Sequence, residues 1–354
     1  MGINVLSLFD GLSCGQIALN RLGIKIDNYF ASEIDKYSIQ ITRKNYPNTI
    51  QLGNIYDINY SDLPRIDLIL GGSPCTYWSI AKKGRETTSE GIGFDLFMQY
   101  VNAVKKYKDA YFVYENNFSM HKNIKLEITE KLGVEPVLIN SAKLSAQNRK
   151  RLYWTNIPNV TQPLNKNISL KDIVFDDALF VGRTVGRRLD ENGTRKDYSD
   201  IPIEQRLEIR ENSKSGTITT VAKDNTILTK EGFAICLHNL YGGFGETKNR
   251  VFLDKSPTIR TPAGGGHIPS VLIEETALNY FNGSKQELID FFKKVPYKQL
   301  KEWNCIRYLH PVECEKLQTI DVNYTEGVSN SQRYKMIGNG FTVDVIGHIL
   351  KGII

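Results

Sequence analysis

The chain has 354 residues, with 45 Lys and Arg against 39 Asp and Glu, and a formal net charge of +6 at pH 7. Apolar residues make up 41% of the chain and charged residues 24%, which is typical of a globular protein and excludes a disordered one. No stretch approaches the ~18 apolar residues of a membrane span, so we expect no membrane partner. The five cysteines are scattered and odd in number, which favours a reducing, cytoplasmic compartment. No Cys/His cluster has zinc-ligand spacing, so no metal is expected.

The N-terminal part of the chain alternates strand-like and helix-like segments. The predicted strands lie at 5–9, 29–32, 67–70, 110–114, 137–140 and 152–155. The predicted helices follow the first strand as far as Leu22, then lie at 35–45 and 95–107, and near the C-terminus at 312–318 and 343–350. This alternation predicts an α/β fold, a mostly parallel sheet with helices on both faces.

The pattern changes between residues 160 and 303, where predicted strands are short, turns are frequent and basic residues are interspersed. Ser215–Thr220 and Ser256–Thr261 are similar β-branched runs, which indicates related strands. We therefore predict two domains. The first comprises residues 1–160 and 304–354, and a smaller β-rich domain comprises residues 161–303.

Four candidate residues come after the carboxyl ends of predicted strands. They are Asp10, Glu33, Cys75 and Glu115. In parallel sheets ligands bind beyond the carboxyl ends of the strands, so these side chains are candidates for one site.

The turn from Phe9 to Gly15 links the first strand to the first helix and lacks the Gly-x-Gly-x-x-Gly dinucleotide spacing. Its backbone N–H groups are able to hold an anionic group, and an acid such as Glu33 after the second strand is the usual partner of ribose hydroxyls. A tight turn beside a surface glutamate is an equally good interpretation of these residues alone.

Cys75 directly follows Pro74, so a nucleophile at this position would sit in a fixed loop. A carboxylic acid such as Glu115 is able to donate a proton while a thiolate attacks. Residues 149–151 supply three cations that suit a phosphate or a base. The alternatives are an inert buried thiol, a polar strand end and a solvated basic turn.

Together and in this order, these segments resemble the cytosine-5 DNA methyltransferase family. The similar segments are Phe9-Asp10-Gly11, Glu33, Gly72-Ser73-Pro74-Cys75, Glu115-Asn116-Asn117, Gln147-x-Arg149-x-Arg151, Arg307–Gln318 and Gly338-Asn339-Gly340. The Ser-Pro-Cys and Phe-Asp-Gly forms also resemble the animal de novo methyltransferases, whereas the compact region 161–303 is similar to bacterial or phage enzymes.

The resemblance implies methyl transfer from S-adenosyl-L-methionine (AdoMet) to carbon 5 of cytosine. In the family's mechanism Cys75 would add to carbon 6, Pro74 would fix the Cys75 loop, and Glu115 would bind and protonate ring N3. Arg151, with Arg149, would bind the cytosine carbonyl oxygen.

The resemblance also implies a set of cofactor contacts. They are Phe9, Asp10, Gly11, Leu12, Ser13, Gly15, Glu33, Ile34, Asn54, Ile55, Ser73, Phe97, Asn339 and Gly340. Two positions depart from the family's pattern. Asn54 replaces the Asp of Gly-Asp-Ile, and Asn117 replaces the Val of Glu-Asn-Val.

A base inside a stacked duplex is out of reach, so the target cytosine must be flipped out. We expect residues 76–94 to close over it, with Lys82, Lys83 and Arg85 on phosphates and Arg85 or Thr87 filling the vacated stack. In the β-rich domain, Thr258 and Arg260 are candidates for base contacts. An ordinary strand whose Arg pairs with phosphate is the alternative.

The expected function is a sequence-specific DNA cytosine-5 methyltransferase of restriction–modification or phage self-protection. We expect it to act on double-stranded DNA as a monomer in a prokaryotic or phage-infected cytoplasm, with a cognate restriction endonuclease as a potential partner. The alternatives are a tRNA cytosine-5 methyltransferase and a catalytically silent DNA-binding protein of the same fold. A Rossmann dehydrogenase is disfavoured because the dinucleotide spacing is absent.

Overall fold

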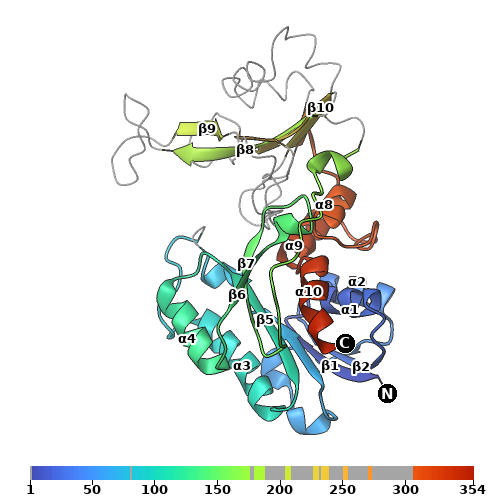
Figure 1. The fold of residues 1–354 in the computed structure, drawn as a ribbon, viewed down its shortest axis with the longest axis vertical. Coiled ribbons are helices and arrows are strands. Elements are labelled where there is room, and N and C mark those ends of the chain that lie inside the picture. The colour runs from blue at the N-terminus through green and yellow to red at the C-terminus, as the bar shows by residue number, and fades with distance from the viewer. Residues whose placement is uncertain are drawn as a thin grey trace. The chain divides into compact units, whose positions relative to one another are not determined.

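The computed structural model describes residues 2–79, 82–175 and 306–354, and strands at 179–187, 204–208, 226–230, 233–238, 250–253 and 270–272 (Figure 1). The chain divides into two compact units. The first comprises Met1–Asn140, Lys150–Leu164 and Phe341–Ile354, and the second comprises Ser141–Arg149 and Asn165–Gly340.

A seven-stranded sheet of order β3-β2-β1-β4-β5-β7-β6 forms the centre of the first unit. Its strands are β1 (Ile3–Leu8), β2 (Ile26–Ser32), β3 (Ile50–Gln51), β4 (Leu68–Gly71), β5 (Tyr111–Asn117), β6 (Val137–Asn140) and β7 (Lys150–Thr155). The pairings among β1 to β5 are all parallel, whereas β7 is antiparallel to both β5 and β6. The sheet is therefore mostly parallel, as predicted.

Helices cover both faces of this sheet, with α3 and α4 on one side and α1, α2 and α10 on the other in Figure 1. The helices are α1 (Cys14–Arg21), α2 (Lys36–Asn45), α3 (Ile92–Lys106), α4 (Lys122–Leu132) and α10 (Val343–Leu350). A methyl group at Gly15 of α1 would collide with Leu70, and one at Gly71 would lie 2.8 Å from the Tyr100 ring of α3. Because Leu70 and Gly71 are consecutive in β4, they point to opposite faces. The predicted fold class is confirmed.

Short 3₁₀ turns complete the first unit. They are η1 (Ile55–Asp57), η2 (Tyr60–Asp62), η3 (Cys75–Tyr77) and η7 (Lys351–Ile353). Strand β3 and helix α4 were not predicted. Strand β3 has only two residues, too few to show an alternation of apolar and polar side chains. In α4 the apolar side chain of Leu126 is exposed, so the apolar residues of this helix do not all lie on its buried face.

An aromatic core supports the strand ends on the α3 side of the sheet. The buried Tyr114 ring of β5 has centroid distances of 5.1 Å to Phe97, 4.9 Å to Tyr100 and 5.9 Å to Trp154. Such close packing keeps the β5 backbone rigid near its polar end.

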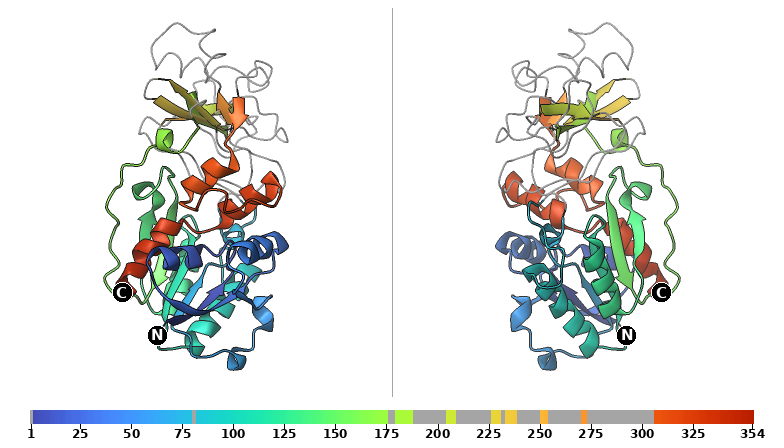
Figure 2. Two further views of the ribbon diagram at one scale, coloured as in Figure 1. Left: turned by 90° about the vertical axis from the view of Figure 1, so that its right-hand side faces the viewer. Right: turned by 90° about the vertical axis from the view of Figure 1, so that its left-hand side faces the viewer.

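Helix α10 returns the C-terminus to the first unit beside α1. Its residues Val345, Ile346 and Ile349 are fully buried, and Asp344 pairs with Arg21 of α1 at 2.9 Å. The two views in Figure 2 show the C-terminal helix alongside the N-terminal strands and helices.

A second seven-stranded sheet, of order β14-β13-β10-β11-β12-β8-β9, belongs to the second unit. Its strands are β8 (Leu179–Arg187), β9 (Glu204–Glu208), β10 (Thr226–Lys230), β11 (Phe233–His238), β12 (Arg250–Leu253), β13 (Ser270–Leu272) and β14 (Ile306–Tyr308). Its described pairings are antiparallel apart from β10 with β13.

The second unit also contains α8 (Pro311–Leu317), α9 (Asn330–Asn339) and the 3₁₀ turns η4 (Ser141–Lys143) and η5 (Leu170–Asp172). Helix α9 was not predicted. A buried ion pair joins α8 to α9, with 3.0 Å between Glu315 Oε1 and Arg333 Nη2. Glu315 also accepts hydrogen bonds from the backbone N–H groups of Asn323 and Thr325, so this buried charge is well compensated.

The compact units divide the chain at other residues than the predicted domain limits, and the two predicted domains stay a prediction. Residues 141–149 join the second unit because the Ser145 hydroxyl donates to the Leu317 carbonyl and the Lys166 N–H to the Lys143 carbonyl, at 2.7 Å. The second unit extends to Gly340, beyond the predicted boundary at 303.

None of the helices in the described ranges has the length and apolar character needed to cross a membrane.

Candidate active site

The carboxyl ends of four neighbouring strands bring the predicted polar residues to one edge of the first unit's sheet. Leu8 of β1 pairs with Ser32 of β2 and Gly71 of β4, and Gly71 pairs with Tyr114 of β5. Glu33 and Glu115 follow these paired residues directly, whereas Asp10 follows after one residue and Cys75 after three. Their shared edge was predicted from strand order, and the register confirms it.

The turn after β1 has three left-handed residues, Phe9, Gly11 and Ser13, at φ 58°, 58° and 55°. Only glycine adopts this conformation without cost, so the strain at Phe9 and Ser13 has to be compensated by surrounding contacts. The N–H groups of this turn bind acceptors of the protein itself: Asp10 donates to the Ser32 carbonyl and Ser13 to the Asp10 carbonyl, each at 3.1 Å.

Glu33 compensates part of this strain. Its Oε2 accepts the Gly11 N–H at 2.8 Å, and its Oε1 accepts the N–H groups of Ile34 at 2.7 Å and Asp35 at 2.8 Å. The carboxylate therefore fixes the turn after β1 and the start of α2 at the same time. The side chain of Ile34 is 75% exposed beside it, which leaves an apolar surface next to a carboxylate.

Asp10 is buried at the centre of the turn. It accepts hydrogen bonds from the Tyr29 hydroxyl at 2.8 Å and from the Ser13 hydroxyl. Burial raises the pKa of Asp10 to about 6, although hydrogen bonds from Ser13, Ser7 and Tyr29 oppose the shift. Its negative charge near neutral pH is therefore held in place by hydroxyl donors.

Most other predicted cofactor residues of the first unit lie in its interior. Leu12, Ser13 and Phe97 are 0% exposed, Gly15 is buried against Leu70, and Ser73 is 3% exposed. In this structure these residues support the turn and the strand ends rather than offering surface to a ligand. Direct cofactor contact by them stays a prediction.

Asn54 and Ile55 differ from each other in exposure. Asn54 is exposed and its Oδ1 accepts the Tyr56 N–H at 3.2 Å, so it caps η1, while Ile55 is buried. Because the cap uses only Oδ1, the side-chain NH₂ group of Asn54 is left as a hydrogen-bond donor. An ionised Asp, which the family's pattern has at this position, offers no donor.

The nucleophile candidate Cys75 is half-buried and begins η3. Pro74 holds φ at −52° directly before it. Asn116 Nδ2 donates to the Ser73 carbonyl at 3.0 Å, and Asn117 Nδ2 donates to the Cys75 carbonyl at 3.2 Å. The end of β5 therefore holds the backbone on both sides of Pro74.

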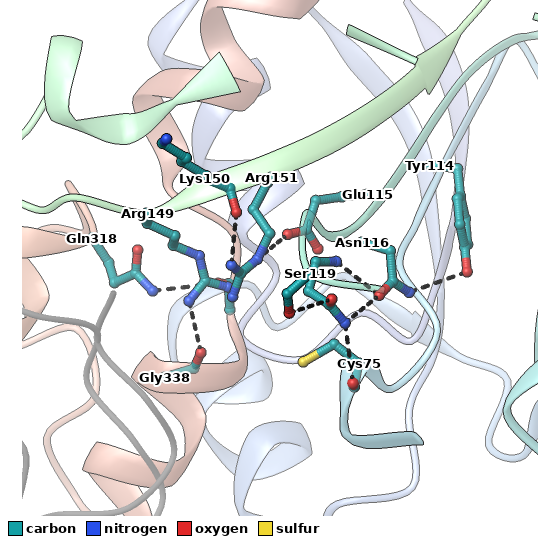
Figure 3. A network of polar contacts seen from close by, with 12 residues as sticks. Cys75, Tyr114, Glu115, Asn116, Ser119, Arg149, Lys150, Arg151, Gln318 and Gly338 are labelled. Atoms are coloured by element: carbon teal, nitrogen blue, oxygen red, sulfur yellow. Dashed lines mark hydrogen bonds and ion pairs between the residues drawn. The ribbon is translucent and has the colours of Figure 1, made fainter. Parts of the chain in front are cut away.

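Glu115 and Arg151 form a largely buried ion pair across β5 and β7. Arg151 Nε lies 2.7 Å from Glu115 Oε1, and the side chains are 10% and 9% exposed (Figure 3). The N–H bond of Arg151 is not well directed at this oxygen, and among the described residues Oε1 has no hydrogen-bond donor. In this structure Glu115 Oε1 is therefore held by the ion pair with Arg151, and its predicted contact with a cytosine stays a prediction.

Arg149 belongs to the second unit and has a different environment. It is 2% exposed, and its Nη1 and Nη2 donate to the carbonyls of Gly338 and Gly340, each at 3.1 Å. These carbonyls end α9, where a cation is favoured by the helix dipole. Arg149 thus stabilises the Gly338-Asn339-Gly340 segment, in which Asn339 is exposed and Gly340 is buried, and its predicted part in catalysis remains untested.

The segment after Cys75 is anchored at several points. Arg85 Nη1 donates to the Ser119 carbonyl at 2.6 Å, and Glu86 accepts from Trp78 Nε1 and the Gly93 N–H, each at 3.1 Å. Arg85 is therefore engaged with its own protein in this structure, and its predicted contact with DNA stays a prediction.

The other predicted DNA contacts of this segment, Lys82, Lys83 and Thr87, are exposed. Thr258 and Arg260 lie outside the described residues. The described residues contain no group of three His, Cys, Asp or Glu side chains able to hold a metal.

Sequence reasoning missed the contact of Asn117 with the nucleophile loop. The signal was present as two consecutive asparagines after Glu115, but only the register of β4 and β5 shows which loop they reach.

A family model described as C-5 cytosine-specific DNA methylase matches residues 3–354. The chain is 27% identical to the orphan methyltransferase M.SPRI of Bacillus phage SPR, over 99% of this chain and 97% of the relative. It is 25% identical to the orphan methyltransferase M.SPBetaI of Bacillus phage SPbeta, with the same coverage. A solved structure of a Spodoptera frugiperda DNMT2 variant has a TM-score of 0.57 and 16% identity, covering 99% of both chains, and shows a shared fold.

Proposed function

Because the chain belongs to the C-5 cytosine-specific DNA methylase family, we propose that it is a sequence-specific enzyme that methylates a flipped-out cytosine through a covalent Cys75 adduct. The family membership makes it a DNA cytosine methyltransferase that uses AdoMet. The observation that carries the proposal is the common strand edge of Cys75 and the Glu115–Arg151 pair.

The residues after β2 fit AdoMet by their chemistry. The Glu33 carboxylate suits ribose hydroxyls, and the exposed Ile34 suits a flat adenine ring. When bound, AdoMet supplies an electrophilic methyl group on a sulfonium.

The protein residues prepare the cytosine for this methyl group. The Cys75 thiolate adds to carbon 6, forming a C–S bond, and the ring electrons shift so that carbon 5 becomes nucleophilic. A protonated Glu115 binds ring N3 and donates its proton there as the thiolate adds, and it takes this proton back when Cys75 is expelled. Arg151, paired with Glu115, binds the carbonyl oxygen.

The reaction ends when a base removes the proton from carbon 5. The electron pair of that C–H bond re-forms the ring double bond and expels Cys75 as a thiolate. We propose solvent water as the base.

The biological setting is also a proposal. Because two full-length relatives are orphan methyltransferases of Bacillus phages, phage DNA self-protection in a bacterial cytoplasm is the setting that we favour. We propose a monomer acting on double-stranded DNA, and restriction–modification with a cognate endonuclease is the alternative setting.

The test is methyl transfer from AdoMet to a random-sequence unmethylated duplex library, mapped at base resolution. Methylation at carbon 5 within one short motif by the wild type, and none by Cys75→Ala, is the expected result. The control Asn102→Ala alters an exposed side chain on α3 and should remain active. AdoMet binding by Cys75→Ala should be unchanged, because Cys75 makes none of the contacts around Glu33.

A methyl-transfer assay on tRNA distinguishes the proposed DNA enzyme from the main alternative, a tRNA cytosine-5 methyltransferase. Preference for tRNA over duplex DNA would establish the RNA enzyme instead. AdoMet binding without transfer to either nucleic acid would indicate a catalytically silent protein.

A further inference from the structure

We propose that Asn117 is a positioning residue that aligns the Cys75 nucleophile and couples it to Arg85. The inference rests on the proposed function of Cys75. The family's motif has Val at this position, and a valine side chain is unable to donate or accept a hydrogen bond.

The hydrogen bonds define how the Asn117 amide is oriented. Its Nδ2 faces two acceptors, the Cys75 carbonyl at 3.2 Å and Asn116 Oδ1 at 3.3 Å, while its Oδ1 accepts the Ser119 hydroxyl at 3.1 Å. If the amide group of Asn117 were rotated by 180°, its oxygen would face the carbonyl oxygen of Cys75 and Oδ1 of Asn116, and neither of them can donate a hydrogen bond. Asn117 is 5% exposed, so its hydrogen bonds compete little with water.

These contacts continue in both directions from Asn117. On the core side, Asn116 Oδ1 accepts the Asn117 N–H at 2.8 Å, and Asn116 Nδ2 contacts Ser73 and Tyr114. On the outer side, the Ser119 carbonyl accepts from Arg85 at 2.6 Å.

Arg85 also reaches back to the nucleophile segment, because its Nη1 lies 3.5 Å from the Trp78 carbonyl. The short η3 turn joins Trp78 to Cys75, and the Trp78 N–H donates to the Cys75 carbonyl at 3.2 Å. The Cys75 carbonyl thus accepts from both Asn117 and Trp78, so a shift of Arg85 alters two neighbours of the nucleophile.

Through this hydrogen bond Asn117 controls the position of the Cys75 thiol. The hydrogen bond acts on the carbonyl of Cys75 itself, so its loss frees the peptide that carries the nucleophile. A displacement of about 1 Å is enough to cost ~10²-fold in rate, so we expect a kcat effect without a binding effect.

The test compares Asn117→Leu, which keeps the side-chain shape, with Asn117→Asp, which keeps an acceptor for Ser119 and loses the donor to Cys75. Ser119→Ala removes only the hydroxyl on the other side. Single-turnover methyl transfer should fall about 10–100-fold in both Asn117 variants, with KM for DNA and the Kd for AdoMet changed less than about twofold. Ser119→Ala should lie between these variants and the wild type. Asn102→Leu, on the exposed face of α3, is the matched control and should be fully active.

Two readouts separate positioning from loss of fold and from failure of the proposed function. The rate of iodoacetamide alkylation at Cys75, resolved by peptide mass spectrometry, needs neither DNA nor cofactor and should rise in Asn117→Leu. In a double-mutant cycle, the loss of transfer rate in the variant that carries both Asn117→Leu and Arg85→Ala should be smaller than the product of the two separate losses.

Unchanged transfer and alkylation rates in Asn117→Leu would overturn the positioning role. Independent effects of Asn117→Leu and Arg85→Ala would overturn the coupling. If the wild type transfers no methyl group while alkylation still responds to Asn117→Leu, the proposed function fails and the positioning contact stands.

Discussion

Arg151 Nε lies 2.7 Å from Glu115 Oε1, and the two residues belong to the antiparallel neighbours β7 and β5. The ladder pairs Arg151 with Asn117, so the guanidinium reaches Glu115 diagonally. The strand pairing therefore places the cation beside the carboxylate, and both lie at the edge that holds Cys75.

Replacing Arg151 by Ala should reduce kcat by about 10²–10³-fold, because one preorganised donor to the base is lost. The substitution also leaves the Glu115 carboxylate without its partner, which should lower the free energy of unfolding by roughly 3 kcal/mol. Single-turnover kinetics and urea unfolding measure the two effects. Lys150→Ala is the control, because the Lys150 side chain is exposed and Arg151 contacts only its carbonyl. Equal rates for the two variants would contradict the role of Arg151.

Gly72→Ala should damage both stability and transfer. A methyl group at Gly72 would lie 2.7 Å from the Glu115 carbonyl oxygen and 3.3 Å from the Phe341 ring, and backbone is unable to yield as a flexible side chain does. We expect a loss of about 1–3 kcal/mol in urea unfolding, together with slower transfer.

The matched control is Gly347→Ala in α10, where no described atom lies within 4 Å of the added methyl group. There alanine should stabilise the protein by about 0.5–1 kcal/mol. Gly72→Ala with wild-type stability would show that the strand ends are less tightly packed than this structure has them.

Glu33→Gln should weaken AdoMet binding. The amide offers one acceptor oxygen where the carboxylate has two, so its NH₂ group would face one of the N–H donors at Gly11, Ile34 or Asp35. Loss of a charge-assisted hydrogen bond predicts a Kd at least about tenfold higher by calorimetry. Glu130→Gln, an exposed change on α4, should bind AdoMet as the wild type does. A Kd for Glu33→Gln equal to that of this control would remove Glu33 from the cofactor site.

The burial of Asp10 should make stability depend on pH. The pKa of Asp10 is raised from 3.8 to about 6, so between these values the folded state holds a proton that the unfolded chain has lost. The stabilising contribution is complete below pH 3.8 and is lost as pH rises through 6, by about 3 kcal/mol in total.

Urea unfolding of the wild type and Asp10→Asn from pH 4 to 8 measures this contribution as the difference between their free energies. The asparagine does not titrate, so the advantage of the wild type should shrink as pH rises and level off above pH 6. Parallel curves would mean that Asp10 is not buried in the way the structure shows.

The sequence itself determined the α/β class, the predicted strand ends and the family, because strand and helix periods and an ordered series of short motifs are local properties. Asp10, Glu33, Cys75 and Glu115 needed only their positions after apolar strands to be assigned to one edge. The short β3 and the weakly amphipathic α4 and α9 could not be predicted in this way, since they depend on packing against distant elements.

Which polar groups meet depends on how the strands pair in the folded chain. The pairing of β5 with β7 sets Arg151 against Glu115, and the pairing of β4 with β5 brings Asn117 to the Cys75 carbonyl. Arg149 and Arg151 are two residues apart and equivalent as charges in a sequence, yet one caps α9 and the other pairs with Glu115. The physical reason is that hydrogen bonds and ion pairs depend on register and on the direction of each side chain, which chain order alone does not specify.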